Sequence, residues 1–285
     1  MILYDSKAWY RTITTVRGTV VPRIAGRVAI LFGIALLVWI LREQVGASLH
    51  ALNPLAHTLI GVALGLLIVF RTNSSYDRYW EGRKQWGGIV NASRNLLRGA
   101  TAYAGNAEGL TRLVAAYPLA LKQHLRGNRD LGELESLIPA DLLAKVAAAG
   151  NPPMVLAVEM SRWIHARVQR QELPVEMARH LEAMVATLLD CQGACERILR
   201  TPIPFVYAVH IRQLLTIYLV SLPFSLIPAM GWSALFAVPA IAFGMLGIEE
   251  AGVEIEDPFG DDPNDLPIEA ICQTIQRDAT TMETV

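Results

Sequence analysis

The sequence predicts an all-α membrane protein in which four transmembrane helices are joined to a helical cytosolic domain. The 285-residue chain is 53% apolar and 18% charged, whereas soluble proteins average about 45–50% apolar and about 25% charged. The mean hydropathy of +0.34 points the same way. Four long apolar stretches stand out, and no convincing strand pattern or internal repeat accompanies them. The composition therefore favours membrane spans over the buried helices of a soluble protein.

The four apolar stretches occur as two pairs, at residues 24–41 and 54–70, and at 203–230 and 232–248. A spanning helix needs roughly 20 apolar residues, so the second and fourth either continue as helix beyond the bilayer or are shielded by neighbours. The chain is divided accordingly into an N-terminal cytosolic segment (1–23), transmembrane helices 1 and 2 (24–70), a helical cytosolic domain (71–202), transmembrane helices 3 and 4 (203–248) and an acidic cytosolic tail (249–285).

The distribution of charge predicts how the chain crosses the membrane. Residues 1–27 contain five Lys and Arg against one Asp, and residues 71–200 contain 17 basic and 13 acidic side chains. Cytoplasmic segments carry an excess of Lys and Arg. We therefore expect a multi-pass protein with both termini and residues 71–202 in the cytoplasm. The polar, aromatic and basic first 20 residues predict no cleavable signal peptide.

The cytosolic region carries helix signals. The run RTNSSYDRYWEGRKQWGGIVNASRNLLR follows the second apolar stretch without a proline, so one helix is expected to run from membrane to cytosol, with Gly87-Gly88 as a candidate kink. Asn151, followed by two prolines, predicts a cap and first turn. Pro174 predicts the start of another helix that ends near Leu199. The three cysteines show no paired spacing and predict no disulfide framework.

Signatures of enzymes and of nucleic-acid binding are missing from the sequence. It has no Gly-x-Ser-x-Gly elbow, no phosphate-binding glycine loop and no His-Glu-x-x-His motif. Its six histidines are scattered, and none lies at metal-ligand spacing with Cys or Asp. Basic residues in 71–200 are interleaved with acids, whereas a nucleic-acid surface is more one-sided. We therefore expect neither an enzyme nor a nucleic-acid partner.

The second apolar stretch carries the most informative pattern. Val62, Leu66 and Phe70 recur every four residues on one helical stripe, beside the small-residue pair Gly61 and Gly65. In a single helix this stripe is ordinary lipid-facing or core-facing surface. In a ring of identical subunits it forms an apolar collar, a hydrophobic gate that closes by dewetting. Four short helices do not easily enclose a water-filled path, so a symmetric ring is expected.

Three segments resemble the bestrophins, a family of pentameric ion channels. They are the RTNSSYDRYWEGRKQWGG run, TPIPFVYAVHIRQLLTIYLVSLPF at the third apolar stretch and DPFGDDPNDLPIEAICQTIQRD near the end. The resemblance implies a homopentamer around a central pore lined by the second helix. Val62, Leu66 and Phe70 would then form the pore neck, and Ile203 the cytosolic aperture. The short C-terminal part resembles prokaryotic members, which implies the bacterial inner membrane.

The resemblance also bears on the acidic run EIEDPFGDDPNDLP. Eukaryotic members hold calcium in a clasp at this place, which implies Glu254, Asp257, Asp262 and Asp265 as ligands of a divalent cation. Asp257 and Glu254 stand where those members have Asn and Gln. Oxygen ligands suit a hard cation, but the acids can equally pair with arginines. No cofactor is required, and whether calcium binds is left open.

The resemblance predicts a channel for monovalent ions, with the lipid bilayer and further copies of the chain as its partners. Short members of the family are associated with cation permeation. An acidic tail beside a pore entrance also raises the local concentration of cations. Cations are therefore the first expectation, and a chloride or other anion channel of the same fold is the alternative. Two hypotheses assign the protein to other functional classes: an alternating-access carrier and a non-conducting membrane scaffold.

Overall fold

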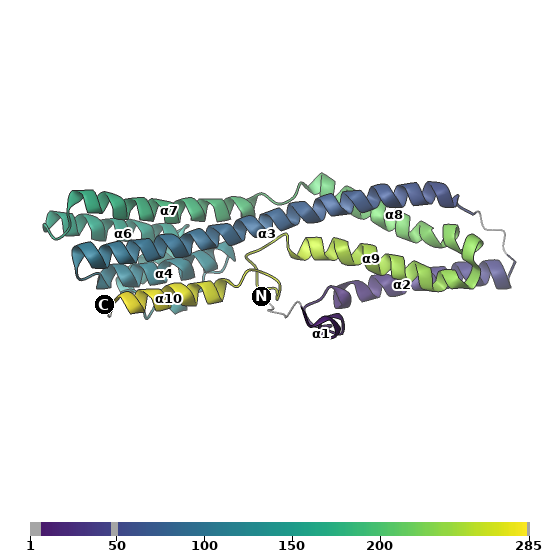
Figure 1. Ribbon diagram of the computed structural model, residues 1–285, viewed down its shortest axis with the longest axis horizontal. Coiled ribbons are helices and arrows are strands. Elements are labelled where there is room, and N and C mark those ends of the chain that lie inside the picture. Colours follow the sequence, from purple (N-terminus) through teal and green to yellow (C-terminus); the bar gives the residue numbers. More distant parts are fainter. Residues whose placement is uncertain (1–6, 47–50, 284–285) are drawn as a thin grey trace. The chain divides into compact units, whose positions relative to one another are not determined.

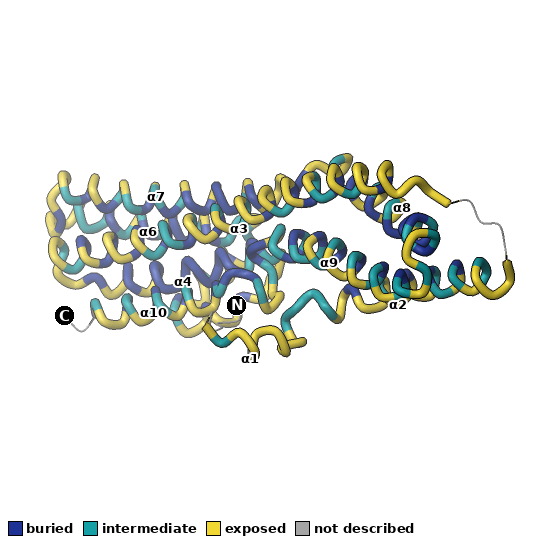
Figure 2. The backbone as a smooth tube through the Cα atoms, turned by 45° about the vertical axis from the view of Figure 1, so that its right-hand side comes forward, coloured by how far each residue is buried: buried dark blue, intermediate teal, exposed yellow. Residues whose placement is uncertain are grey.

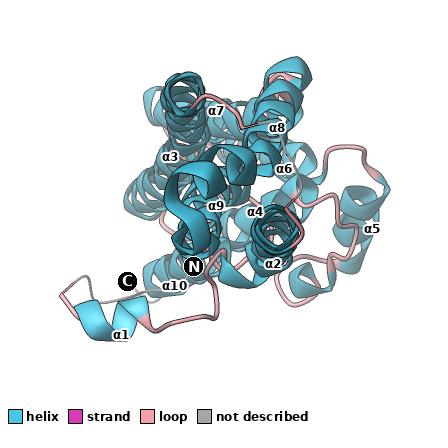
Figure 3. Cartoon of the chain, turned by 90° about the vertical axis from the view of Figure 1, so that its right-hand side faces the viewer, coloured by secondary structure: helices cyan, strands magenta, loops and turns pink. Residues whose placement is uncertain are grey.

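The computed structural model describes residues 7–46 and 51–283. Within these ranges the chain forms helices and loops and no strand (Figure 3). The order of the helices along the chain can be followed in Figure 1. The all-helical prediction is therefore confirmed. The chain divides into two compact units.

The first unit contains Met1–Tyr79, Pro202–Asp257 and Asp262–Asn264. Its helices are α1 (Trp9–Ile13), α2 (Val21–Trp39) with a π-helical end (Ile40–Gln44), the first part of α3 (Pro54–Ala104), α8 (Phe205–Met230) and α9 (Ala234–Glu254). A 3₁₀ turn (Gly231–Ser233) connects α8 to α9. Gly231 has a φ of +59°, a conformation that glycine adopts without steric cost.

The core of the first unit is a set of aliphatic side chains from four helices. These side chains pack together, and they are Ile24, Leu31 and Ala35 of α2, Leu64 and Ile68 of α3, Ile211, Leu215, Leu219 and Leu222 of α8, and Val238, Ala242 and Leu246 of α9. Gly61 permits a close approach of α3 to α8, because a Cβ there would lie 2.6 Å from the hydroxyl of Tyr218. No atom of a described residue lies within 4 Å of a Cβ built on Gly65.

Three helical stretches of the described chain are long and apolar enough to cross a membrane. They are Val21–Gln44, Pro54–Ala104 and Phe205–Glu254. The last contains α8 and α9, which pack against each other. The four apolar stretches of the sequence thus become α2, the first part of α3, α8 and α9.

The second unit contains Trp80–Thr201, Pro258–Asp261 and Asp265–Val285. It consists of the rest of α3, α4 (Glu108–Leu125), a 3₁₀ turn (Gly132–Leu134), α5 (Ala140–Ala148), α6 (Pro152–Gln169), α7 (Val175–Arg200) and α10 (Ile268–Glu283). The predicted helix starts are confirmed: Asn151 Oδ1 accepts a hydrogen bond of 3.2 Å from the Met154 N–H, and Pro174 caps α7.

The Tyr117 hydroxyl and the three cysteine thiols are buried inside the second unit. The Tyr117 hydroxyl donates to the Leu188 carbonyl at 3.0 Å and contacts Gln192 Oε1 at 2.9 Å, and burial raises the pKa of Tyr117 well above its usual value. Cys191, Cys195 and Cys272 are free and buried. Burial raises the pKa of Cys195 to about 12 and that of Cys272 to about 12, so neither presents a reactive thiolate at neutral pH.

The two glycines expected to kink the helix lie inside an unbroken α3. The reason for glycine at position 88 is packing, because a Cβ there would lie 2.7 Å from the sulfur of Cys191 in α7. A helix backbone can approach a neighbouring helix this closely only where the side chain is absent. Gly88 therefore marks a close contact between α3 and α7.

Replacing Gly88 with alanine tests this contact. Overpacking of a tight interior costs about 1–3 kcal/mol, so Gly88→Ala is expected to lower the melting temperature of the purified protein. Gly193→Ala is the matched control, because no described atom lies within 4 Å of a Cβ at that position and alanine in a helix interior is favoured over glycine by about 1 kcal/mol. A melting temperature of Gly88→Ala equal to that of Gly193→Ala would contradict the close contact.

Candidate functional site

One face of α3 is left uncovered by the rest of the first unit. Val62, Leu66 and Phe70 are 60%, 56% and 61% exposed, and their spacing of four residues places them on one side of the helix. Leu64 and Ile68, on the opposite side, are buried in the core. The exposed residues along α3 appear in yellow in Figure 2. The structure thus brings the three predicted neck residues together on a single exposed apolar stripe.

The same face turns polar directly after Phe70. Asn73, Ser74 and Asp77 are exposed. The Ser74 hydroxyl donates to the Phe70 carbonyl at 3.0 Å, and the Thr72 hydroxyl donates to the Ile68 carbonyl at 2.9 Å. Because these short side chains bond back to the helix rather than compete with it, α3 continues through the polar run. The exposed face of α3 is therefore apolar over residues 62–70 and polar from residue 73 onward.

A buried ion pair holds this part of α3 against α9. Arg71 is 1% exposed and Glu249 is 3% exposed. Arg71 Nη1 donates to Glu249 Oε1 at 2.8 Å, and Arg212 Nε of α8 donates to the same oxygen at 3.0 Å. Arg71 Nη2 also donates to Glu256 Oε2 at 3.4 Å. A buried charge is tolerated only when it is paired and hydrogen-bonded, so these contacts hold Arg71, the residue directly after Phe70, in a fixed position.

Further arginines of α2 pair with the acids that follow the fourth apolar stretch. Arg27 forms an ion pair with Glu250. Arg23 Nη2 lies 3.2 Å from Asp262 Oδ1 and 3.8 Å from Glu254 Oε1. The first unit therefore neutralises much of the acidity that begins at Glu249.

The sequence predicts that the acidic run is either a cation clasp or a set of arginine partners. Glu254 is buried and accepts a 3.0 Å hydrogen bond from Asn264 Nδ2, which also donates to the carbonyl of Gly18 at 2.9 Å. No group of three or more His, Cys, Asp or Glu side chains among the described residues has an arrangement that could hold a metal ion. The contacts of Glu254 and Asp262 thus follow the arginine alternative.

The second unit holds its own part of the run through Arg126, which sequence reasoning missed. Arg126 donates to the carbonyls of Phe259 and Gly260 at 3.1 and 2.9 Å, and its Nη1 lies 3.0 Å from Asp261 Oδ1 and 2.5 Å from Glu269 Oε1. Burial is the largest single influence on the pKa of Glu269 and would raise it, but the hydrogen bond from Arg126, a backbone hydrogen bond and the charges of Arg126 and Lys122 together hold that pKa below its usual value. The only sequence signal for Arg126 is its basic charge.

Ile203, the predicted aperture residue, is buried in the single chain. Its backbone N–H donates to Glu256 Oε1 at 3.3 Å, which ties the start of the third apolar stretch to the end of α9. Phe205 and Val206, two and three residues further on, are strongly exposed. The aperture therefore stays a prediction, which the burial of Ile203 in one chain does not favour.

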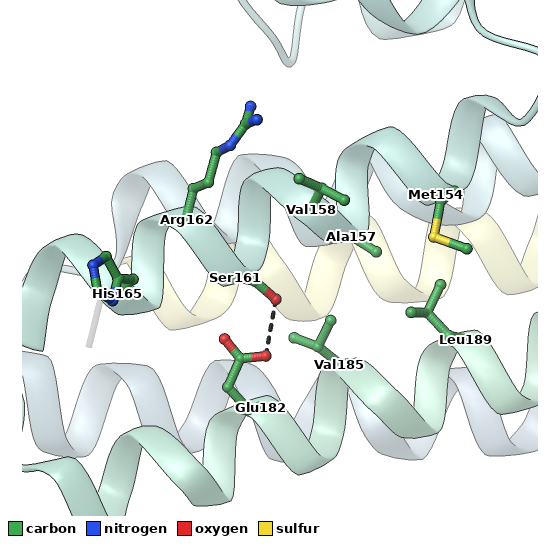
Figure 4. A pocket seen from close by; sticks show the side chains of 9 residues that line it. All are labelled: Met154, Ala157, Val158, Ser161, Arg162, His165, Glu182, Val185 and Leu189. Atoms are coloured by element: carbon green, nitrogen blue, oxygen red, sulfur yellow. Dashed lines mark hydrogen bonds between the residues drawn. The ribbon is translucent and has the colours of Figure 1, made fainter.

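The second unit also contains an open apolar groove of about 440 Å³ between α6 and α7 (Figure 4). Ser161 Oγ donates to Glu182 Oε2 across it at 2.8 Å, so the hydroxyl is directed at a carboxylate rather than at the groove. Met154, Val158 and Val185 supply apolar walls. This groove offers apolar contact and little chemistry, so the exposed face of α3 is the stronger candidate site.

Comparison with known proteins places this geometry in a family. A family model described as Bacterial/Fungal Bestrophin protein matches residues 1–281, and the chain belongs to the bestrophin family, as the resemblance predicted. A protein of Nostoc sp. named voltage-dependent anion channel-forming protein is 38% identical over 282 residues, covering 95% of this chain and 90% of that protein. A Synechocystis protein of the same description is 37% identical over 281 residues, with the same coverage.

Solved structures show the same fold. A bacterial bestrophin homologue from Klebsiella pneumoniae superposes with a TM-score of 0.86 at 26% sequence identity, covering 92% of this chain and 98% of that one. The exposed stripe on α3 thus belongs to a bestrophin-type ion-channel fold.

Removing one partner of the buried ion pair is expected to destabilise the first unit strongly. Glu249→Gln leaves the buried Arg71 guanidinium with only its longer 3.4 Å contact to a carboxylate, that of Glu256, and the loss of one partner of a buried pair typically costs about 3–5 kcal/mol. Glu43→Gln is the matched control, because the Arg42–Glu43 pair is partly exposed at 3.7 Å and such pairs contribute about 0–1 kcal/mol. Melting temperatures in detergent compare the two. Equal melting temperatures would contradict the role given to Glu249.

Proposed function

We propose that this protein is a homopentameric channel in which copies of α3 surround a central pore, and Val62, Leu66 and Phe70 form its hydrophobic neck. The observation that carries the proposal is the uncovered stripe on α3. Membership of the bestrophin family supports it. A ring of copies would turn the stripe toward a common axis and bury it from lipid, and a narrow apolar constriction can gate ions by dewetting.

The polar continuation of the stripe is compatible with a pore that opens into water beyond Phe70. A neck that opens into a wider aqueous vestibule accounts for the change from Phe70 to Asn73 and Asp77. The proposal includes four spans (α2, the first part of α3, α8 and α9) in the bacterial inner membrane with both termini cytoplasmic, and Ile203 near a second constriction.

For the permeant ion, we propose anions such as chloride. The relatives of known description are named as anion channel-forming proteins, which favours the alternative over the initial expectation of cations. That expectation drew on the acidic tail, but Glu249, Glu250 and Glu254 are paired with arginines and contribute little free negative potential. Cations remain the second candidate because one unpaired carboxylate, Asp77, lies on the exposed face of α3.

The acidic run is proposed to have a structural role that needs no cofactor. Arg23 pairs with Glu254 and Asp262, and Arg126 pairs with Asp261. A divalent cation at Glu254, Asp257, Asp262 and Asp265 is the competing proposal. Conductance measured with calcium and with a calcium chelator distinguishes the two, because a required metal makes chelation abolish the current.

Shortening a neck side chain is expected to raise conductance. Leu66→Ala removes three carbon atoms from each copy at the centre of the stripe, which widens the constriction and lowers the cost of wetting it. We expect single-channel conductance in a planar bilayer to increase severalfold. Ile60→Ala is the matched control, because Ile60 is equally exposed but lies on another side of α3. Unchanged conductance for Leu66→Ala, or an equal change for both variants, would contradict the neck.

The sign of the permeant ion is tested by the reversal potential of purified protein in a bilayer with unequal NaCl on the two sides. The anion proposal predicts a reversal near the chloride equilibrium potential. A reversal near the sodium potential would select the second candidate, and the absence of any current would contradict the channel itself and favour a non-conducting scaffold.

A further inference from the structure

We propose that Asp77 sets the charge preference of the conducting path, by repelling anions and attracting cations at the polar end of the neck. The inference rests on the proposed function, because it requires the exposed face of α3 to line that path. It concerns a residue outside the neck, and it holds whichever ion the channel passes most readily.

Asp77 shares the face of the neck residues. It lies seven residues after Phe70 and eleven after Leu66 in one continuous helix. At 100° per residue, seven residues bring Asp77 to within about 20° of Phe70 and about 10 Å further along the axis. The carboxylate therefore stands two turns beyond the apolar neck, on the stripe that the rest of the first unit leaves open.

The charge of Asp77 is not neutralised within the described part of the chain. Asp77 is exposed and forms no ion pair with any residue that the structure describes. The two arginines nearest in sequence have partners elsewhere: Arg71 is buried against Glu249 at 2.8 Å, and Arg78 Nε donates to the Glu256 carbonyl at 3.1 Å. The carboxylate is thus free to act on ions in the adjoining water.

Asp77 is the first ionisable side chain on this face after the neck. Val62, Leu66 and Phe70 carry no charge, so the neck itself distinguishes ions by hydration and size rather than by sign. A symmetric assembly would repeat the carboxylate once per copy. Rings of Asp or Glu favour cations in channels, and a concentrated negative potential raises the local concentration of cations while lowering that of anions.

A charge series at this position tests the proposal. Asp77→Asn is expected to move the reversal potential in unequal NaCl toward the chloride potential, with the ratio of cation to anion permeability falling on the order of threefold to tenfold. Asp77→Lys is expected to move it further in the same direction, and Asp77→Glu to leave it near wild type. The direction is the same for an anion-selective and a cation-selective parent. An unchanged reversal for both Asn and Lys would overturn the inference.

Controls separate this inference from the proposed function. Asp190→Asn removes one exposed carboxylate from α7 and is expected to leave the reversal potential unchanged; a shift equal to that of Asp77→Asn would overturn the assignment. A wild type that conducts, with higher conductance in Leu66→Ala but no shift in the Asp77 series, overturns the inference alone. A wild type that carries no current overturns the proposed function and the inference with it.

The salt dependence of the wild type gives a second measurement that needs no variant. The interaction of an exposed charge with ions in water is screened by salt, because the Debye length falls from about 10 Å near 0.1 M salt to about 3 Å near 1 M. The cation-to-anion permeability ratio of the wild type is therefore expected to fall as salt rises at a constant gradient. A ratio that stays constant over this range would also overturn the role of Asp77.

Discussion

The buried ion pair between Arg71 and Glu249 is the constraint on which the candidate site depends. Arg71 immediately follows Phe70, and its side chain lies on the same side of α3 as Leu64 and Ile68. Once this side is held against α9, the period of 3.6 residues per turn turns Val62, Leu66 and Phe70 outward. The aliphatic core alone would resist rotation of α3 less strictly, because apolar contacts are not directional. A charged hydrogen bond fixes the angle.

Charge pairing in the first unit also bears on selectivity. The tail looks strongly acidic in the sequence, yet Glu249 and Glu250 pair with arginines, and Glu254 and Asp262 share Arg23. Paired charges produce a weak field at a distance, so a count of the acidic residues overestimates the electrostatic attraction of the tail for cations. Asp77 differs because its charge is left exposed. Ion preference would then depend on a single position of α3 more than on the composition of the tail.

Sequence reasoning reached the parts of the fold that local patterns encode. Apolar length located α2, α3, α8 and α9, and cap chemistry located the starts of α6 and α7, because both signals lie within one helix. It failed where a residue acts through a distant partner. Gly88, one of the two glycines expected to kink α3, instead allows Cys191 to approach, and neither Arg126 nor Glu249 could be singled out without knowing which carbonyls and guanidinium groups they meet. Ile203, assigned by resemblance, is buried in one chain, and its role as the aperture stays a prediction.

The central claim is that the exposed stripe of α3 faces a water-filled path rather than lipid. Single cysteines at positions 62, 66 and 70, each introduced alone, test it directly with a charged, membrane-impermeant thiol reagent applied during current recording. The three native cysteines are buried, so background modification is expected to be small. The account predicts rapid block of current for Leu66→Cys and Phe70→Cys, and none for Ile60→Cys on another side of the helix. Block at position 60 with no effect at positions 66 and 70 would contradict it.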